Sequence, residues 1–169
     1  MPDIDLVPWF LVLHVLGAII AFGPGFTFPI IGRMGGTEQA HGNFATRISL
    51  AISTQRVIPV ALTMPITGIG LIWSAGLNPF QHETRWLLAG IILYTLALTY
   101  SLAVQLPAVR KIIALTSGPP SGAPQGPPPS GPPPGLMETI RMVQRGGLFV
   151  SGLVVVIAFL MVVKPDLGF

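Results

Sequence analysis

The sequence predicts an all-α membrane protein: a four-helix transmembrane bundle with a disordered loop, rich in proline and glycine, on its cytoplasmic side. Only 9% of the residues are charged, against about 25% in a soluble globular domain. A chain of 169 residues has much surface for its volume, so a soluble fold would need a polar exterior that so few charges cannot build. Mean hydropathy is +0.73, and the apolar residues are gathered in four long uncharged segments.

The four segments are the predicted transmembrane spans. They cover about residues 6–31, 57–77, 86–109 and 142–163; the uncharged part of the last begins at Gly146, and Met142 and Val143 extend it. Crossing the hydrocarbon core takes about 20 residues, and lipid offers no partner to backbone groups, so each segment should be a helix. None shows the alternation of apolar and polar residues over about 10 positions that is typical of a membrane β-strand. Residues 1–169 are therefore expected to form a single membrane domain.

The basic residues predict the orientation. Seven of the nine lie in the loops after the first and third spans, namely Arg33, Arg47, Arg56, Arg110, Lys111, Arg141 and Arg145. The other side has Arg85 and Lys164. Because loops rich in Lys and Arg are retained in the cytoplasm, we expect a multi-pass protein of the cell membrane with both termini extracytoplasmic. Trp9, Trp73 and Trp86 would then form an aromatic belt at the outer interface.

Two features interrupt the apolar pattern. Prolines, with glycines in the first span, should break or kink the first two spans, at Gly23-Pro24-Gly25 and Pro29, and at Pro59 and Pro65. The polar segment 37–55 has apolar residues at helical spacing. It is expected to be either an interfacial helix or a cytoplasmic extension of the second span.

Residues 118–135 form a Pro-rich segment with nine prolines and five glycines among 18 residues. Proline lacks an amide hydrogen and has a fixed φ, which disfavours helix and sheet. We expect an extended, flexible polyproline II chain. The Pro124 and Pro127 spacing would allow a partner with an aromatic groove to bind, so one interpretation is a scaffold that recruits a cytoplasmic partner.

His14 is the candidate ligand, because it is the one histidine within a predicted span. A neutral imidazole there could bind haem b or copper, with Met161 as a further axial ligand, or could simply hydrogen-bond a neighbouring helix. We expect it to point towards the second or fourth span. His82, beside Glu83 in an outer loop, is a second candidate metal ligand, or else a solvated loop residue.

Several function classes are excluded or disfavoured. The chain has no cysteine, which rules out disulfides and thiolate metal sites. No phosphate-binding glycine loop, zinc-binding His-Glu motif or Ser-His-Asp set is present, so we expect no enzyme. The basic residues form no run or stripe, so no nucleic acid is expected as a partner.

Two short motifs carry a resemblance to known families. Leu13-His14-Val15-Leu16-Gly17-Ala18 and Arg145-Gly146-Gly147 resemble the first and last helices of a bacterial family of four-helix integral membrane proteins of unknown function. The first motif is also similar to helices in copper-resistance D-type proteins and in small haem-binding membrane proteins. That similarity implies a ligand role for His14.

The leading interpretation is an integral membrane protein that is not an enzyme, an accessory subunit or a small transporter. The alternatives are a haem- or copper-binding protein that uses His14, and a scaffold that acts through the Pro-rich segment. The expected contacts are the lipid bilayer and either other membrane subunits or further copies of the chain.

Overall fold

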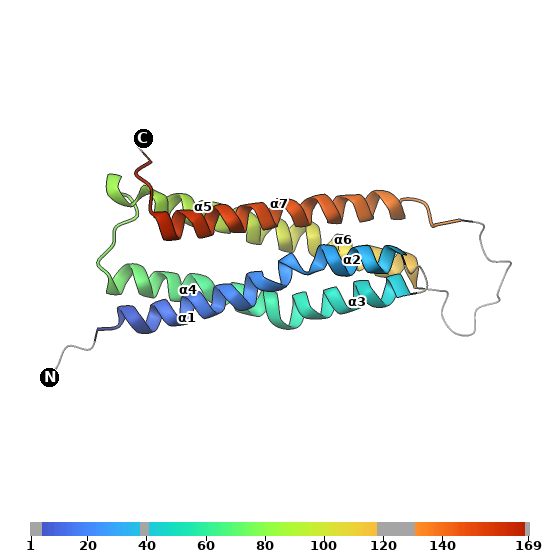
Figure 1. Ribbon diagram of the computed structural model, residues 1–169, viewed down its shortest axis with the longest axis horizontal. Helices are drawn as coiled ribbons and strands as arrows, with labels where there is room; N and C mark the ends of the chain where they lie inside the picture. The colour runs from blue at the N-terminus through green and yellow to red at the C-terminus, as the bar shows by residue number, and fades with distance from the viewer. Residues whose placement is uncertain (1–4, 38–40, 118–130, 168–169) are drawn as a thin grey trace.

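The computed structural model describes residues 5–37, 41–117 and 131–167, and all regular structure within them is helical. Four long helical segments run side by side, Val7–Thr37, Gly42–Ser74, His82–Thr116 and Leu136–Val163 (Figure 1). Each is long and apolar enough to cross a membrane. The predicted all-α, four-span fold is thus confirmed. Most of the Pro-rich segment, residues 118–130, lies outside the described residues.

Three of the four segments change helix type part-way along. The elements are α1 (Val7–Phe22), the 3-10 turn η1 (Gly23–Phe26), α2 (Phe28–Thr37), α3 (Gly42–Ile52), the π turn η3 (Ser53–Val57), α4 (Ile58–Ser74), the short 3-10 turn η4 (His82–Thr84), α5 (Arg85–Tyr100), the π turn η5 (Ser101–Gln105), α6 (Leu106–Thr116) and α7 (Leu136–Val163). Helices α3 and α4 form one continuous segment, so residues 42–55 extend the second span rather than forming a separate interfacial helix.

Prolines account for these interruptions. Pro24 lies within η1, where the predicted break is confirmed. Pro59 and Pro107 each follow a π turn by two residues. A proline ring cannot donate to the carbonyl four residues earlier and collides with it, and a wider turn relieves that collision. Pro65, by contrast, lies inside α4 with no change of helix type.

The interruptions lie at one level of the molecule. At about 1.5 Å per residue, η1 is about 24–28 Å from the start of α1, η3 about 26–32 Å from the end of α4, and η5 about 24–30 Å from the start of α5. That distance matches the roughly 30 Å thickness of the hydrocarbon core. We call the part containing α1, α4, α5 and the C-terminal end of α7 the terminal half, and the part containing α2, α3, α6 and the start of α7 the basic half (Figure 1).

The two halves differ in chemistry. Helices α1, α4 and α5 are strongly apolar around most of their circumference, as lipid requires. Helices α2, α3 and α6 are amphipathic, like helices that cover a core and face water. Six of the seven basic residues of the two basic loops lie in η3 or in the basic half, and Arg145 lies at the boundary of that half. Arg85 and Lys164 lie at the opposite end of the molecule.

Within the terminal half the helices pack as two pairs, α1 with α4 and α5 with α7 (Figure 1). The pairs meet where the Tyr94 hydroxyl donates to the Ala61 carbonyl oxygen, and where the Tyr94 ring lies edge-on to Phe22 at 6.4 Å. An apolar cluster centred on Trp86, Leu87 and Leu160 packs the start of α5 against the end of α7.

The expected aromatic belt is partly wrong. The Trp9 and Trp73 side chains are 69% and 76% exposed at that end, as a belt requires. Trp86 is only 7% exposed, and the Lys164 ammonium group lies 5.5 Å from its ring centroid. Packing against Leu160 draws Trp86 into the core instead.

Candidate functional site within the membrane

The polar site in the terminal half joins α1 to α4. His14 Nδ1 lies 2.8 Å from the Thr67 hydroxyl oxygen, and that hydroxyl lies 3.0 Å from the Met64 carbonyl oxygen. A hydroxyl has a single hydrogen to donate. When it donates to Met64, the Nδ1–H of a neutral imidazole donates to Thr67, and Nε2 keeps its lone pair. The expected direction of His14, towards the second span, is confirmed.

Glycines allow the close approach on which this site depends. Gly68 borders the imidazole, and a methyl group there would lie 3.5 Å from His14 Cε1. A Cβ at Gly17 would lie 2.7 Å from Met64 Sδ, and Gly70 is covered by the Phe10 ring. The small residues of the first span, Gly17 and the buried Ala21, therefore serve packing within the bundle.

The haem b or copper hypothesis depends on which side chains could join His14 as ligands. Nε2 could bind a metal, and a second hydrogen bond through Nδ1 is common among ligating histidines. The described residues, however, hold no cluster of three or more His, Asp or Glu side chains that could bind a metal ion. Met161, the expected axial partner, packs over Gly90 in the other helix pair.

His82 has a partner of its own, apart from His14. Its Nδ1 lies 3.7 Å from Asp166 Oδ1, and the two side chains are 55% and 76% exposed. This contact ties the η4 loop to the segment after α7. An exposed pair of this kind is a loop contact, and the described residues place no cluster of three possible metal ligands around it.

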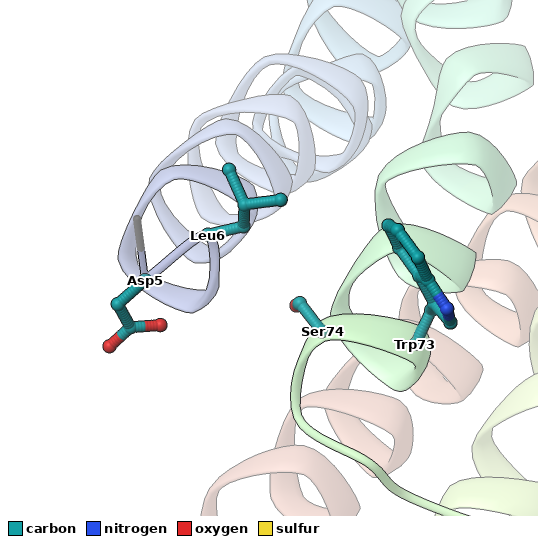
Figure 2. A pocket seen from close by; sticks show the side chains of 4 residues that line it. All are labelled: Asp5, Leu6, Trp73 and Ser74. Atoms are coloured by element: carbon teal, nitrogen blue, oxygen red, sulfur yellow. The ribbon is translucent and has the colours of Figure 1, made fainter. Parts of the chain in front are cut away.

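The hollows on the surface include two with defined lining residues. One, of about 210 Å³, lies between the start of α1 and the end of α4, and Figure 2 shows its lining residues Asp5, Leu6, Trp73 and Ser74. Asp5 is the one ionisable residue of the four, and its carboxylate accepts from the Val7 amide at 3.0 Å. It therefore satisfies the backbone amide of the first residue of α1. The hollow offers no pair of groups for catalysis.

The other hollow is an apolar groove of about 290 Å³ between α2 and α3. Its lining residues are Ile31, Met34, Gly35, His41, Phe44, Ala45 and Ile48. Met34 and Phe44 are 61% and 64% exposed. This α2–α3 groove lies in the basic half.

One further polar contact was not foreseen from the sequence. The Gln105 side-chain nitrogen in η5 donates to the Val143 carbonyl oxygen of α7 at 3.2 Å. The approach is close because Gly146 has no side chain, and the Tyr100 hydroxyl and Gln105 occupy that space. Gly146 faces this contact, whereas a Cβ at Gly147 would lie 3.9 Å from Gln105 Nε2.

Comparison with known families agrees with this architecture. Residues 9–165 match the family described as "Predicted integral membrane protein (DUF2269)". The chain belongs to this family. No curated protein and no solved structure matches this chain. The resemblance to a membrane family of unknown function is thereby confirmed, and the chain is a multi-pass integral membrane protein in contact with the lipid bilayer.

The His14–Thr67 contact leads to a prediction about stability. Hydrogen bonds between membrane helices contribute about 0.6 kcal/mol on average. We expect a double-mutant cycle of His14→Leu and Thr67→Val, measured by reversible unfolding in detergent, to give a coupling energy of about this size. His14→Gln should retain part of it. Thr63→Val is the matched control, because the Thr63 hydroxyl bonds only the Val60 carbonyl of its own helix.

The same variants test the ligand hypothesis. A purified wild-type protein with a Soret band, or with bound copper, that is lost in His14→Gln would contradict a purely structural role.

Proposed function

We propose that the protein is a non-catalytic accessory subunit of a membrane assembly, with its termini outside the cell and its basic half on the cytoplasmic side. The observation that carries the proposal is the length of the helical segments. The first three have 31, 33 and 35 residues. At about 1.5 Å per residue they reach about 46–52 Å, whereas the hydrocarbon core is about 30 Å thick.

The excess length belongs to the basic half. If the exposed Trp9 and Trp73 mark one interface, the hydrocarbon ends near η1, η3 and η5, and α2, α3 and α6 project beyond it. Their amphipathic pattern supports this placement, since a helix that emerges from lipid needs a polar face. The charge asymmetry between the two ends supports the cytoplasmic side for this half.

The α2–α3 groove supports the role of a subunit. An exposed apolar surface outside the bilayer is typical of a protein interface. Met34 and Phe44 are flexible or aromatic side chains that suit such a contact. The absence of a catalytic cluster among the described residues is compatible with a role through binding.

The proposal predicts how single cysteines react, which the cysteine-free chain allows to be measured cleanly. We expect Phe80→Cys, at 79% exposure in the loop before α5, to react with a membrane-impermeant maleimide in intact cells. Met137→Cys in the basic half should react only in inverted vesicles. Val155→Cys, 56% exposed on the terminal half of α7, should be protected by lipid in both.

Phe44→Cys tests the accessory role itself. In inverted vesicles from cells that overproduce the chain it should react as readily as Met137→Cys. At native expression level the partner subunit should protect it, while Met137→Cys stays reactive. Equal reactivity of both cysteines at native level would contradict an accessory subunit that docks at the groove, and labelling of Phe80→Cys only from the inside would reverse the orientation.

A further inference from the structure

The basic residues of the basic half lie in a narrow range of depth. Arg56 and Arg145 are about 27 Å from the terminal ends of α4 and α7, at about 1.5 Å per residue. Arg141 is at about 33 Å, and the other four lie at about 38–41 Å, namely Arg33, Arg47, Arg110 and Lys111. A bilayer is about 30 Å thick in hydrocarbon and about 40–45 Å with both headgroup layers. The seven cations therefore lie at the depth of one headgroup layer, from its boundary with the hydrocarbon to its outer side.

Most of these cations have no partner among the residues that the structure describes. All seven are exposed. Arg47 donates to the Ser117 hydroxyl at 3.4 Å. The other six have no ion pair and no hydrogen bond from their side chains among the described residues. In the described parts of this half Glu138 is the one carboxylate, and no cation lies within ion-pair distance of it.

We propose that these six residues, Arg33, Arg56, Arg110, Lys111, Arg141 and Arg145, form a phosphate-binding collar for anionic phospholipids of the inner leaflet. Cationic side chains near a membrane surface attract anionic lipids. Arginine also presents several N–H donors in a planar fork that matches the oxygens of a phosphate group. The collar goes beyond the accessory role, since it requires the depth of the basic half but no partner protein.

The depth favours lipid over a soluble acidic partner. Arg56 and Arg145 lie at the boundary of the hydrocarbon, where long side chains extend to the headgroups. A protein docked on the tips of α2, α3 and α6 would approach Arg33, Arg110 and Lys111, but it would have to enter the headgroup layer to reach Arg56 or Arg145. A lipid phosphate is already at that level, next to each of the four helical segments.

The test uses the full chain reconstituted in phosphatidylcholine vesicles with trace spin-labelled phosphatidylglycerol or phosphatidylcholine. We expect the labelled phosphatidylglycerol to associate more strongly, and high salt to reduce the difference. Arg56→Gln/Arg145→Gln should lower the relative association by about 30-fold, which corresponds to about 1 kcal/mol for each of the two cations removed near the surface. Arg56→Lys/Arg145→Lys should keep most of it. Arg85→Gln/Lys164→Gln, which removes the same charge at the other end, should not change it.

The outcomes distinguish the alternatives. Equal association of both lipids with the wild-type protein overturns the collar. So does an equal loss in the Arg85→Gln/Lys164→Gln control. Displacement of the labelled lipid by millimolar inorganic phosphate would assign the cations to free phosphate instead. A third outcome combines equal association of the two lipids with a loss of protection in the cysteine experiment. If Arg56→Gln/Arg145→Gln makes Phe44→Cys reactive at native expression level, the cations bind an acidic protein partner. If Arg56→Gln/Arg145→Gln loses the preference for phosphatidylglycerol while Phe44→Cys stays protected, the collar is supported independently of the accessory role.

Discussion

Replacing Gly146 with alanine should lower the free energy of unfolding by about 1–3 kcal/mol, the usual cost of overpacking. The added Cβ would lie 2.5 Å from the Tyr100 hydroxyl oxygen and 2.7 Å from Gln105 Nε2. Both distances are far below van der Waals contact, so the Gln105 side chain must shift, and the stiff Tyr100 ring must shift with it or α7 must move away from α5. That movement would also weaken the Gln105 bond to the Val143 carbonyl, which ties η5 to α7.

A glycine on the same helix is the control for Gly146. A Cβ at Gly152 meets nothing within 4 Å. Alanine is a better helix former than glycine by about 0.8–1.0 kcal/mol in water, so Gly152→Ala should be neutral or stabilising. Reversible unfolding in detergent measures both variants. If Gly146→Ala were as stable as Gly152→Ala, the close packing of α7 against η5 would be wrong.

Gly70→Ala is expected to have an effect of similar size, again about 1–3 kcal/mol, at the α1–α4 contact. Its Cβ would lie 2.4, 2.5 and 2.8 Å from three atoms of the Phe10 ring. Because α4 is the main neighbour of α1, displacement of Phe10 would loosen the whole first span. The ring cannot bend as a methionine side chain can, so relief requires the helices to separate.

Gly68→Ala is the matched control for Gly70. It lies two residues away on α4, and its Cβ would make an ordinary contact of 3.5 Å with His14 Cε1. We expect little loss of stability in this variant. Phe10→Leu should partly restore the stability of Gly70→Ala, since the smaller side chain leaves room for the methyl group. Failure of that rescue, with a stable Gly68→Ala, would place the damage elsewhere than under the Phe10 ring.

The sequence alone determined the features that depend on local chemistry. The four spans follow from the length of each apolar segment, because lipid forces the backbone into helices. The break at Gly23-Pro24-Gly25 follows from proline acting on the turn just before it. The gathering of basic residues at one end follows from counting them loop by loop. The side of the membrane on which that end lies stays a prediction.

Only the tertiary structure decided which side chains meet. His14 could have faced the fourth span, but it bonds Thr67 of the second. Trp86 could have joined the aromatic belt, but it is buried. Gly146, not Gly147, lies under Tyr100 and Gln105. Each of these outcomes depends on the rotation of a helix about its own axis, by about 100° per residue at 3.6 residues per turn.

The physical reason is the solvent. In water, a helix shows its buried face by an apolar stripe, and α2, α3 and α6 carry one. In the membrane, lipid and protein interior are both apolar, so α1 and α4 are apolar on nearly every face. Their pattern therefore predicts that they cross the membrane but not which way they turn. That rotation is set by shape, through the glycines that let Phe10 and Met64 pack closely.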